Sequence, residues 1–209
     1  KLGEPAFWKG IQDYLDQNKF KNVDTEVFFD AMSKSSGVNL DSFRKQWLYN
    51  VDLPSLEVSE DGNKLVVKQP AQGYDFPVDV WILNDGQWVK KGLQVNGAVN
   101  TLDLGALAGK PVLVDPEVHT MALVTYKMNY DANDWLTLYN KAPNAAQKML
   151  IINQGFPALS SGQKIITARD ESVPQLKTRL FQILDNSGAA YLIQQSQSSN
   201  GIFREAAVD

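Results

Sequence analysis

The period of the hydrophobic pattern changes twice along the chain, and this constrains the fold more than any single motif does. Apolar residues recur at helical spacing over about residues 4–50, alternate with polar residues over about 55–130, and return to helical spacing from about 131. A period near 3.6 predicts a helix with one apolar face, and a period of two predicts a half-buried strand. The sequence therefore predicts a multi-part α+β fold with domains at 1–53, 54–130 and 131–209.

The first part is predicted to contain three short helices. Residues 22–25 offer N-cap side chains for the second helix, Gly37 offers its C-terminal stop, and the third begins near Asn39 or Asp41 and ends before Pro54. Three short helices have little room to bury six large aromatic groups on their own. We therefore expect residues 5–48 to be an interface, to self-associate, or to be the least stable segment; the aromatic groups are Phe7, Trp8, Phe28, Phe29, Phe43 and Trp47.

The second part is predicted to be a small antiparallel β-sandwich of about seven strands. Asp61-Gly62 and Asp85-Gly86 lie between alternating segments, and such dipeptides favour the positive φ values of tight hairpin turns. In the segment before Asp85, alternation places Val78, Val80 and Ile82 on one inward face.

The third part is predicted to be a series of short amphipathic helices. Successive helices joined by tight turns are typical of helical-hairpin arrays of the solenoid kind, and the sequence shows no repeat strong enough to prove such an array. The signals are an Asp131 or Asp134 cap before Trp135, Pro143 in the first turn of a helix that ends at Gly155, Ser172 as the cap of a helix with Pro174 near its start, and a weaker helix at 189–195.

The residue inventory excludes several kinds of chemistry. The chain has one histidine, His119, and no cysteine. A His-Glu-x-x-His zinc site needs two imidazoles, and a thiolate site needs cysteine. No Gly-x-Ser-x-Gly elbow, dinucleotide-binding motif or phosphate loop is present. We therefore assign no catalytic, metal-ligating or cofactor-binding residue and expect no cofactor in this chain by itself.

Three weaker patterns have a functional and a structural interpretation. Asp115, Glu117 and His119 alternate in one short segment, which suits a weak metal site but more simply predicts a polar loop. Asp170 and Glu171 would suit a glycosidase only if they faced a cleft, and they precede a helix, where negative charge is favourable. Aromatic residues in the second part would suit a sugar-stacking platform or a core; they are Tyr74, Phe76, Trp81 and Trp88.

Charge and hydropathy narrow the range of partners. The formal net charge is −4 and the positive residues are scattered, so nucleic acid is not an expected partner. No apolar run approaches the 18 or so residues of a membrane-spanning helix. The chain does not begin with Met and is expected to begin inside a longer polypeptide. Nothing in the sequence indicates a compartment.

One family resemblance appears in the first 58 residues. It rests on Gly3-Glu4-x-x-Phe7-Trp8, Ile11, Tyr14-Leu15, Phe20-Lys21-Asn22, Thr25, Phe29, Ser36-Gly37, Leu40, Phe43, Trp47 and Pro54-x-Leu56-x-Val58. This pattern resembles the stretch that closes the catalytic domain in zinc peptidases of the aminopeptidase N and leukotriene hydrolase family. The chain departs from it at Val51-Asp52-Leu53-Pro54, where the family commonly has Gly shortly before the Pro.

The resemblance implies that the chain is the C-terminal portion of such a peptidase. In that family a small sandwich and a HEAT-like helical domain follow, in the same order as the periodicity gives here. The zinc motif and catalytic residues of the family lie upstream of the matching stretch, so none is carried over. The implied partners are a missing N-terminal catalytic region and a peptide substrate, with zinc in the parent. Two alternatives remain: an interaction scaffold of the same architecture without peptidase activity, and a carbohydrate-binding β-sandwich.

Overall fold

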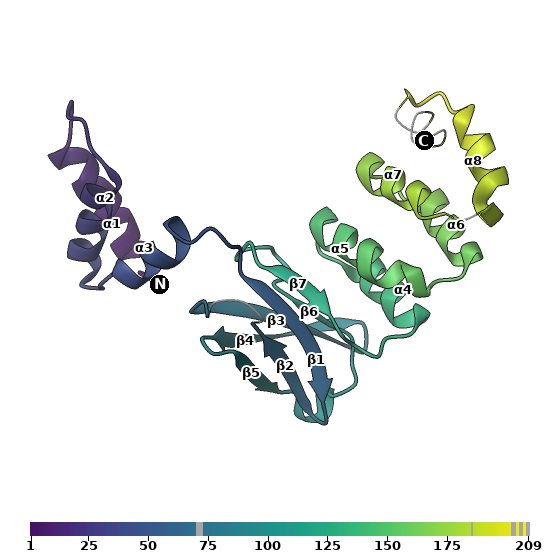
Figure 1. Cartoon of the computed structure of the whole chain (residues 1–209), viewed down its shortest axis with the longest axis horizontal. Coiled ribbons are helices and arrows are strands. Elements are labelled where there is room, and N and C mark those ends of the chain that lie inside the picture. Colours follow the sequence, from purple (N-terminus) through teal and green to yellow (C-terminus); the bar gives the residue numbers. More distant parts are fainter. Residues whose placement is uncertain (70–72, 185, 202–203, 205–206, 208–209) are drawn as a thin grey trace. The chain divides into compact units, whose positions relative to one another are not determined.

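The computed structural model describes residues 1–69, 73–184, 186–201, 204 and 207, so the last residues of the predicted 131–209 part lie outside the described residues. The chain divides into two compact units, Lys1–Leu53 and Pro54–Asp209 (Figure 1). The first is helical, and the second contains two β-sheets and a series of helices. The α+β class expected from the sequence is confirmed.

The first unit consists of helices α1 (Glu4–Gln17), α2 (Thr25–Ser36) and α3 (Asp41–Leu48). The predicted boundaries of α2 are confirmed: the Asp24 side chain accepts a hydrogen bond from the backbone N–H of Val27, and Gly37 adopts a left-handed conformation with φ of 70°. Helix α1 approaches α2 closely at Gly10, where an added Cβ would lie 2.6 Å from Ser35 Oγ. A side chain at this position would force the two helices apart.

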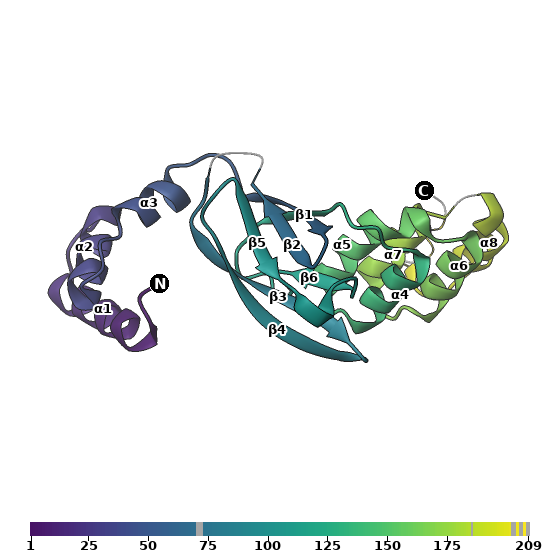
Figure 2. The same cartoon turned by 90° about the horizontal axis from the view of Figure 1, so that it is seen from below.

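The second unit begins with two sheets (Figure 2). The four-stranded sheet has the order β5-β2-β1-β7, and the three-stranded sheet has the order β4-β3-β6. One expectation is wrong: β1 and β7 pair in parallel, whereas the other four strand pairs are antiparallel. A parallel pair needs a long connection, which the intervening strands supply. The strands are β1 (Ser55–Asp61), β2 (Lys64–Lys68), β3 (Phe76–Asn84), β4 (Gln87–Val95), β5 (Val99–Asp103), β6 (Val112–Val114) and β7 (Leu123–Tyr126).

Strand β3 carries the centre of the β core. Val78, Val80 and Ile82 are buried, as the alternation predicts. Trp81 and Leu83, on the opposite face, are buried as well, so the alternation is lost in the second half of the strand. The strand ends in the predicted turn, where Asp85 and Gly86 both have positive φ, 49° and 79°.

Helices α4 (Ala132–Lys141), α5 (Ala145–Gly155), α6 (Ser161–Asp170), α7 (Pro174–Gln182) and α8 (Ala189–Ser196) complete the described part of the second unit. Asp131 caps α4 in a capping box with Asp134, so both candidate cap residues take part. Two predicted helix starts are wrong. Pro143 does not lie in the first turn of α5 but before the helix, which Asn144 caps.

The N-cap residue of α7 is Val173, whose side chain makes no capping hydrogen bond, so the predicted cap Ser172 is wrong. The Glu171 carboxylate instead accepts hydrogen bonds from the backbone N–H groups of Ser172 and Val173. Helix α6 is not among the predicted helices, because its apolar residues do not form a clear stripe; Ser160 and Gln163 form its capping box.

Amide side chains on α5 join the helices to the sheets. Gln154 donates through Nε2 to the Val124 carbonyl at 2.7 Å and accepts from the Tyr126 N–H at 2.7 Å, so it satisfies exposed backbone groups of the edge strand β7. Gln147 donates to the Asp115 carbonyl at 2.9 Å. These bonds join the sheets to the helices within the second compact unit.

Candidate functional site

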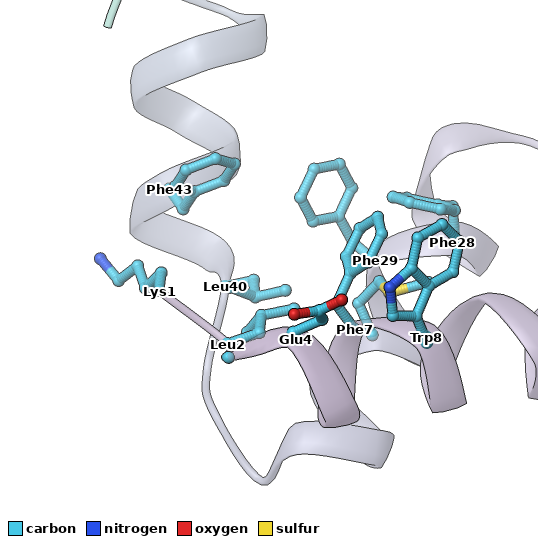
Figure 3. Close-up of a pocket in the computed structure, with 11 residues that line it drawn as sticks. Lys1, Leu2, Glu4, Phe7, Trp8, Phe28, Phe29, Leu40 and Phe43 are labelled. Atoms are coloured by element: carbon cyan, nitrogen blue, oxygen red, sulfur yellow. The ribbon is translucent and has the colours of Figure 1, made fainter. Parts of the chain in front are cut away.

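The first unit contains an apolar groove of about 620 Å³ (Figure 3). All three helices and the residues before α1 line it: Lys1, Leu2, Gly3, Glu4, Phe7, Trp8, Phe28, Phe29, Met32, Leu40 and Phe43. Phe7 and Trp8 contact each other edge to face at 5.3 Å, yet they remain 39% and 58% exposed. The expectation that three helices cannot bury all of these rings is confirmed.

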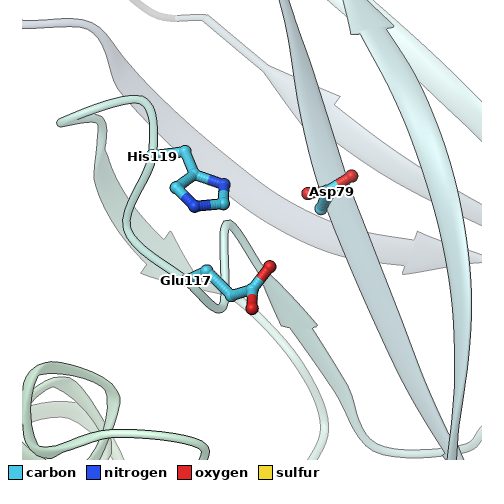
Figure 4. Close-up of side chains that lie close together, drawn as sticks. All are labelled: Asp79, Glu117 and His119. Atoms are coloured by element: carbon cyan, nitrogen blue, oxygen red, sulfur yellow. The ribbon is translucent and has the colours of Figure 1, made fainter.

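A second group of side chains lies on the sheets of the second unit, where Asp79, Glu117 and His119 come together (Figure 4). Their candidate ligand atoms all lie within 4.8 Å of one another, and all three residues are exposed. Asp79 comes from the middle of β3, and the other two come from the segment after β6. The pairing of β3 with β6 brings them together, since the Asp115 N–H donates to the Asp79 carbonyl at 2.8 Å.

Asp115 does not belong to this group, which corrects the set that the sequence predicts. It is 3% exposed, and its carboxylate accepts from the backbone N–H groups of His119 and Thr120 and from the Thr120 hydroxyl, at 2.9, 3.0 and 2.6 Å. Asp115 therefore holds the loop in shape. Sequence reasoning missed Asp79 because only the strand pairing places it beside Glu117 and His119.

A polar pocket of about 400 Å³ lies among α4, α5, α6 and the residues before α7. Glu171, which is buried, accepts hydrogen bonds from the Tyr139 hydroxyl and from Lys148 Nζ, the latter at 2.9 Å. Burial raises the pKa of Tyr139, and the Glu171 carboxylate raises it further. Burial opposes ionisation of Glu171, but the bonds from Tyr139, the Val173 N–H and Lys148 outweigh it, so its pKa is lowered.

The glycosidase interpretation of Asp170 and Glu171 fails on this geometry. Both residues line the pocket, but Asp170 pairs with Arg169 at 2.7 Å and Glu171 is bound by Lys148. The pKa of each carboxyl is lowered. A glycosidase needs one carboxylic acid with a raised pKa as its proton donor, and neither residue meets this requirement.

The chain is similar in sequence to parts of several aminopeptidases. No family model matches the chain. Aminopeptidase 2, mitochondrial, of Saccharomyces cerevisiae is 41% identical over 69 residues, which is 32% of this chain and 7% of that protein. Glutamyl aminopeptidase of Rattus norvegicus is 26% identical over 142 residues, which is 62% of this chain and 15% of that protein.

The chain is related to a portion of aminopeptidase N-type enzymes. The resemblance seen in the first 58 residues is thereby confirmed. The fold agrees over nearly the whole chain with a crystal structure of Legionella pneumophila aminopeptidase A in complex with aspartic acid. That match has a TM-score of 0.59 and 18% identity, and it covers 98% of this chain and 27% of the other. The chain thus spans only a small share of the length of each relative.

The aromatic residues of the second part do not lie as a sugar-stacking platform would require. Tyr74, Phe76 and Trp81 are buried, and the Trp81 and Trp88 rings lie 5.9 Å apart at an angle of 52°. They do not form the exposed, coplanar surface that sugar stacking requires. Among the residues that the structure describes, no helix is long and apolar enough to cross a membrane.

Proposed function

We propose that this chain is the non-catalytic C-terminal region of a zinc aminopeptidase, in which it acts as a spacer and a wall for the catalytic domain. The relatedness to aminopeptidases carries the proposal, in combination with a sequence that has one histidine and no cysteine. Zinc-dependent hydrolysis of a peptide needs a metal held by several side chains. The zinc and the peptide substrate are therefore assigned to other parts of the parent protein.

We further propose that residues 1–53 are the helical end of the catalytic domain, 54–130 a β-sandwich spacer, and 131–209 a HEAT-like helical wall. The presence of two sheets and the burial of the β3 side chains support the sandwich. The succession of short helices from α4 to α8 supports the helical array.

The apolar groove of the first unit is the surface through which this region contacts the rest of the parent. Its exposed rings, Phe7 and Trp8, are large apolar groups of the kind that interfaces bury. The relatives contain much more chain than is matched here, so chain to cover the groove is present in proteins of this type. In the chain by itself, the same surface favours self-association through residues 5–48.

The test uses the protein encoded by the complete gene, and compares Trp8→Asp with Val51→Asp. Trp8 lines the groove, whereas Val51 is 94% exposed and lies outside it. We expect Trp8→Asp to lower the melting temperature and the rate of aminoacyl-reporter cleavage, because a charge is buried in an apolar interface. Val51→Asp should leave both unchanged, and the 209-residue chain alone should cleave no reporter.

Equal behaviour of the two variants would show that nothing covers the groove, and would overturn its assignment as the contact surface. A complete protein that is folded but cleaves no reporter would instead favour the interaction scaffold over the peptidase.

A further inference from the structure

We propose that Asp79, Glu117 and His119 bind one divalent transition-metal ion, with Zn²⁺ as the natural probe (Figure 4). This site is separate from the zinc assigned to the parent enzyme and does not depend on the proposed function. It departs from the expectation of no metal, which came from counting histidines and cysteines along the sequence. The fold adds Asp79, a ligand that this count does not include.

The distances suit a metal of this size. Zinc binds nitrogen and oxygen ligands at about 2.0–2.2 Å, so tetrahedral ligand atoms lie about 3.4 Å from one another. The three candidate atoms lie within 4.8 Å of one another. Because all three side chains are exposed, small rotations about their side-chain bonds suffice to close the remaining gap.

The charges of the group favour a cation. Two carboxylates lie side by side, and within the described part of the chain no side chain of the three takes part in a hydrogen bond or ion pair. A bound cation would neutralise this local negative charge. The imidazole decides the kind of cation, since nitrogen-containing sites suit zinc and its neighbours, whereas calcium and magnesium prefer oxygen ligands alone.

Strand pairing and hydrogen bonds hold the backbone on both sides of the group. Asp79 lies on β3, the central strand of its sheet. The loop that carries Glu117 and His119 is fixed by the Asp115 carboxylate, and α5 holds the loop through bonds from Gln147 to the Asp115 carbonyl and from Asn144 to the Pro116 carbonyl. A site supported in this way keeps its ligands close to the geometry for binding.

The test is a calorimetric titration of the full 209-residue chain, without a polyhistidine tag and after chelator treatment, with Zn²⁺. We expect saturable binding of one ion per chain. His119→Gln and Asp79→Asn should each weaken the affinity about tenfold or more. The matched control is Asp85→Asn, which removes the same charge from the exposed turn after β3 and places Asn at a positive φ that it tolerates.

A second readout reports on the imidazole directly. His119 is the only histidine, so its ring ¹⁵N signals are unambiguous, and they should shift on addition of Zn²⁺ to the native chain but not to Glu117→Gln. Circular dichroism confirms that each variant is folded. Absence of saturable binding, an unchanged affinity in His119→Gln, or equal binding of Mg²⁺ and Ca²⁺ would each overturn the proposal.

Discussion

The two units of the chain use their large apolar side chains in different ways. In residues 1–53, Met32 and Leu40 are the only buried hydrophobic residues, while Phe7 and Trp8 remain exposed around an open groove. In residues 54–209, the strands and helices bury most of theirs, and Val80 on β3 is 0% exposed. The second unit thus has a core of its own, whereas the first has an apolar surface that its own three helices leave exposed.

This difference shows that correct local structure does not require a complete core. Both ends of α2 are satisfied locally, by the Asp24 cap and the Gly37 stop, whereas α1 and α3 begin without a side-chain cap. Helical stability in proteins comes mostly from packing of the apolar face. In the first unit α2 therefore has well-formed ends, but the unit as a whole has little apolar burial to stabilise its helices.

The largest expected effect is in the core of the second unit. Val80→Asp buries an unpaired charge at a fully buried position and should cost several kcal/mol, enough to unfold the sheets. The control is Val99→Asp on β5, where the side chain is 57% exposed. Thermal melts followed by near-ultraviolet circular dichroism compare them, and native-like melting of Val80→Asp would show that the register assigned to β3 is wrong.

A smaller effect is expected where α5 meets α4. Gly155 packs so closely on the Trp135 ring that an added Cβ would overlap it. Gly155→Ala should therefore destabilise the second unit by about 3 kcal/mol. Gly162 on α6 has open space around it, so Gly162→Ala should be neutral or slightly stabilising. Chemical denaturation measures both, and equal midpoints for the two variants would contradict the close packing.

The smallest of the three effects depends on pH. Removal of the Glu171 charge, in Glu171→Gln, weakens the bonds from Lys148 and Tyr139 and should cost about 2 kcal/mol at pH 7. Because the folded pKa of Glu171 is lowered, its stabilisation is complete above the unfolded pKa of about 4.3 and is lost as pH falls through the folded pKa.

Denaturation of the native chain and of Glu171→Gln at pH 7 and pH 3 tests this sign. The difference in unfolding free energy should shrink at pH 3. A difference that stays constant between the two pH values would show that the carboxylate charge does not contribute.

The sequence was most informative where structure is local. The Asp85-Gly86 turn, the Asp131 cap and the inward face of β3 depend on residues close in the chain, and all three were predicted correctly. The parallel pairing of β1 with β7 could not be predicted, because both strands satisfy a period of two in either orientation. The proximity of Asp79 to Glu117 and His119 could not be predicted either, because these two residues come from a distant segment of the chain.

Helix α6 shows a further limit of periodicity. Its apolar residues are few and spread around the helix, and only its Ser160 and Gln163 capping box marks its start. The resemblance in the first 58 residues rests on the spacing of apolar and aromatic residues, and the aminopeptidase relatives confirm it.

Residues 54–209 form a self-sufficient core, whereas residues 1–53 do not. Amide hydrogen exchange measured segment by segment tests this difference most directly. Size-exclusion chromatography establishes that the chain is monomeric under the conditions used. Local opening in segments with few buried contacts costs little free energy. We predict fast exchange in residues 5–48 and slow exchange in β3 and β6. Uniformly slow exchange across residues 5–48 of a monomeric chain would contradict the account.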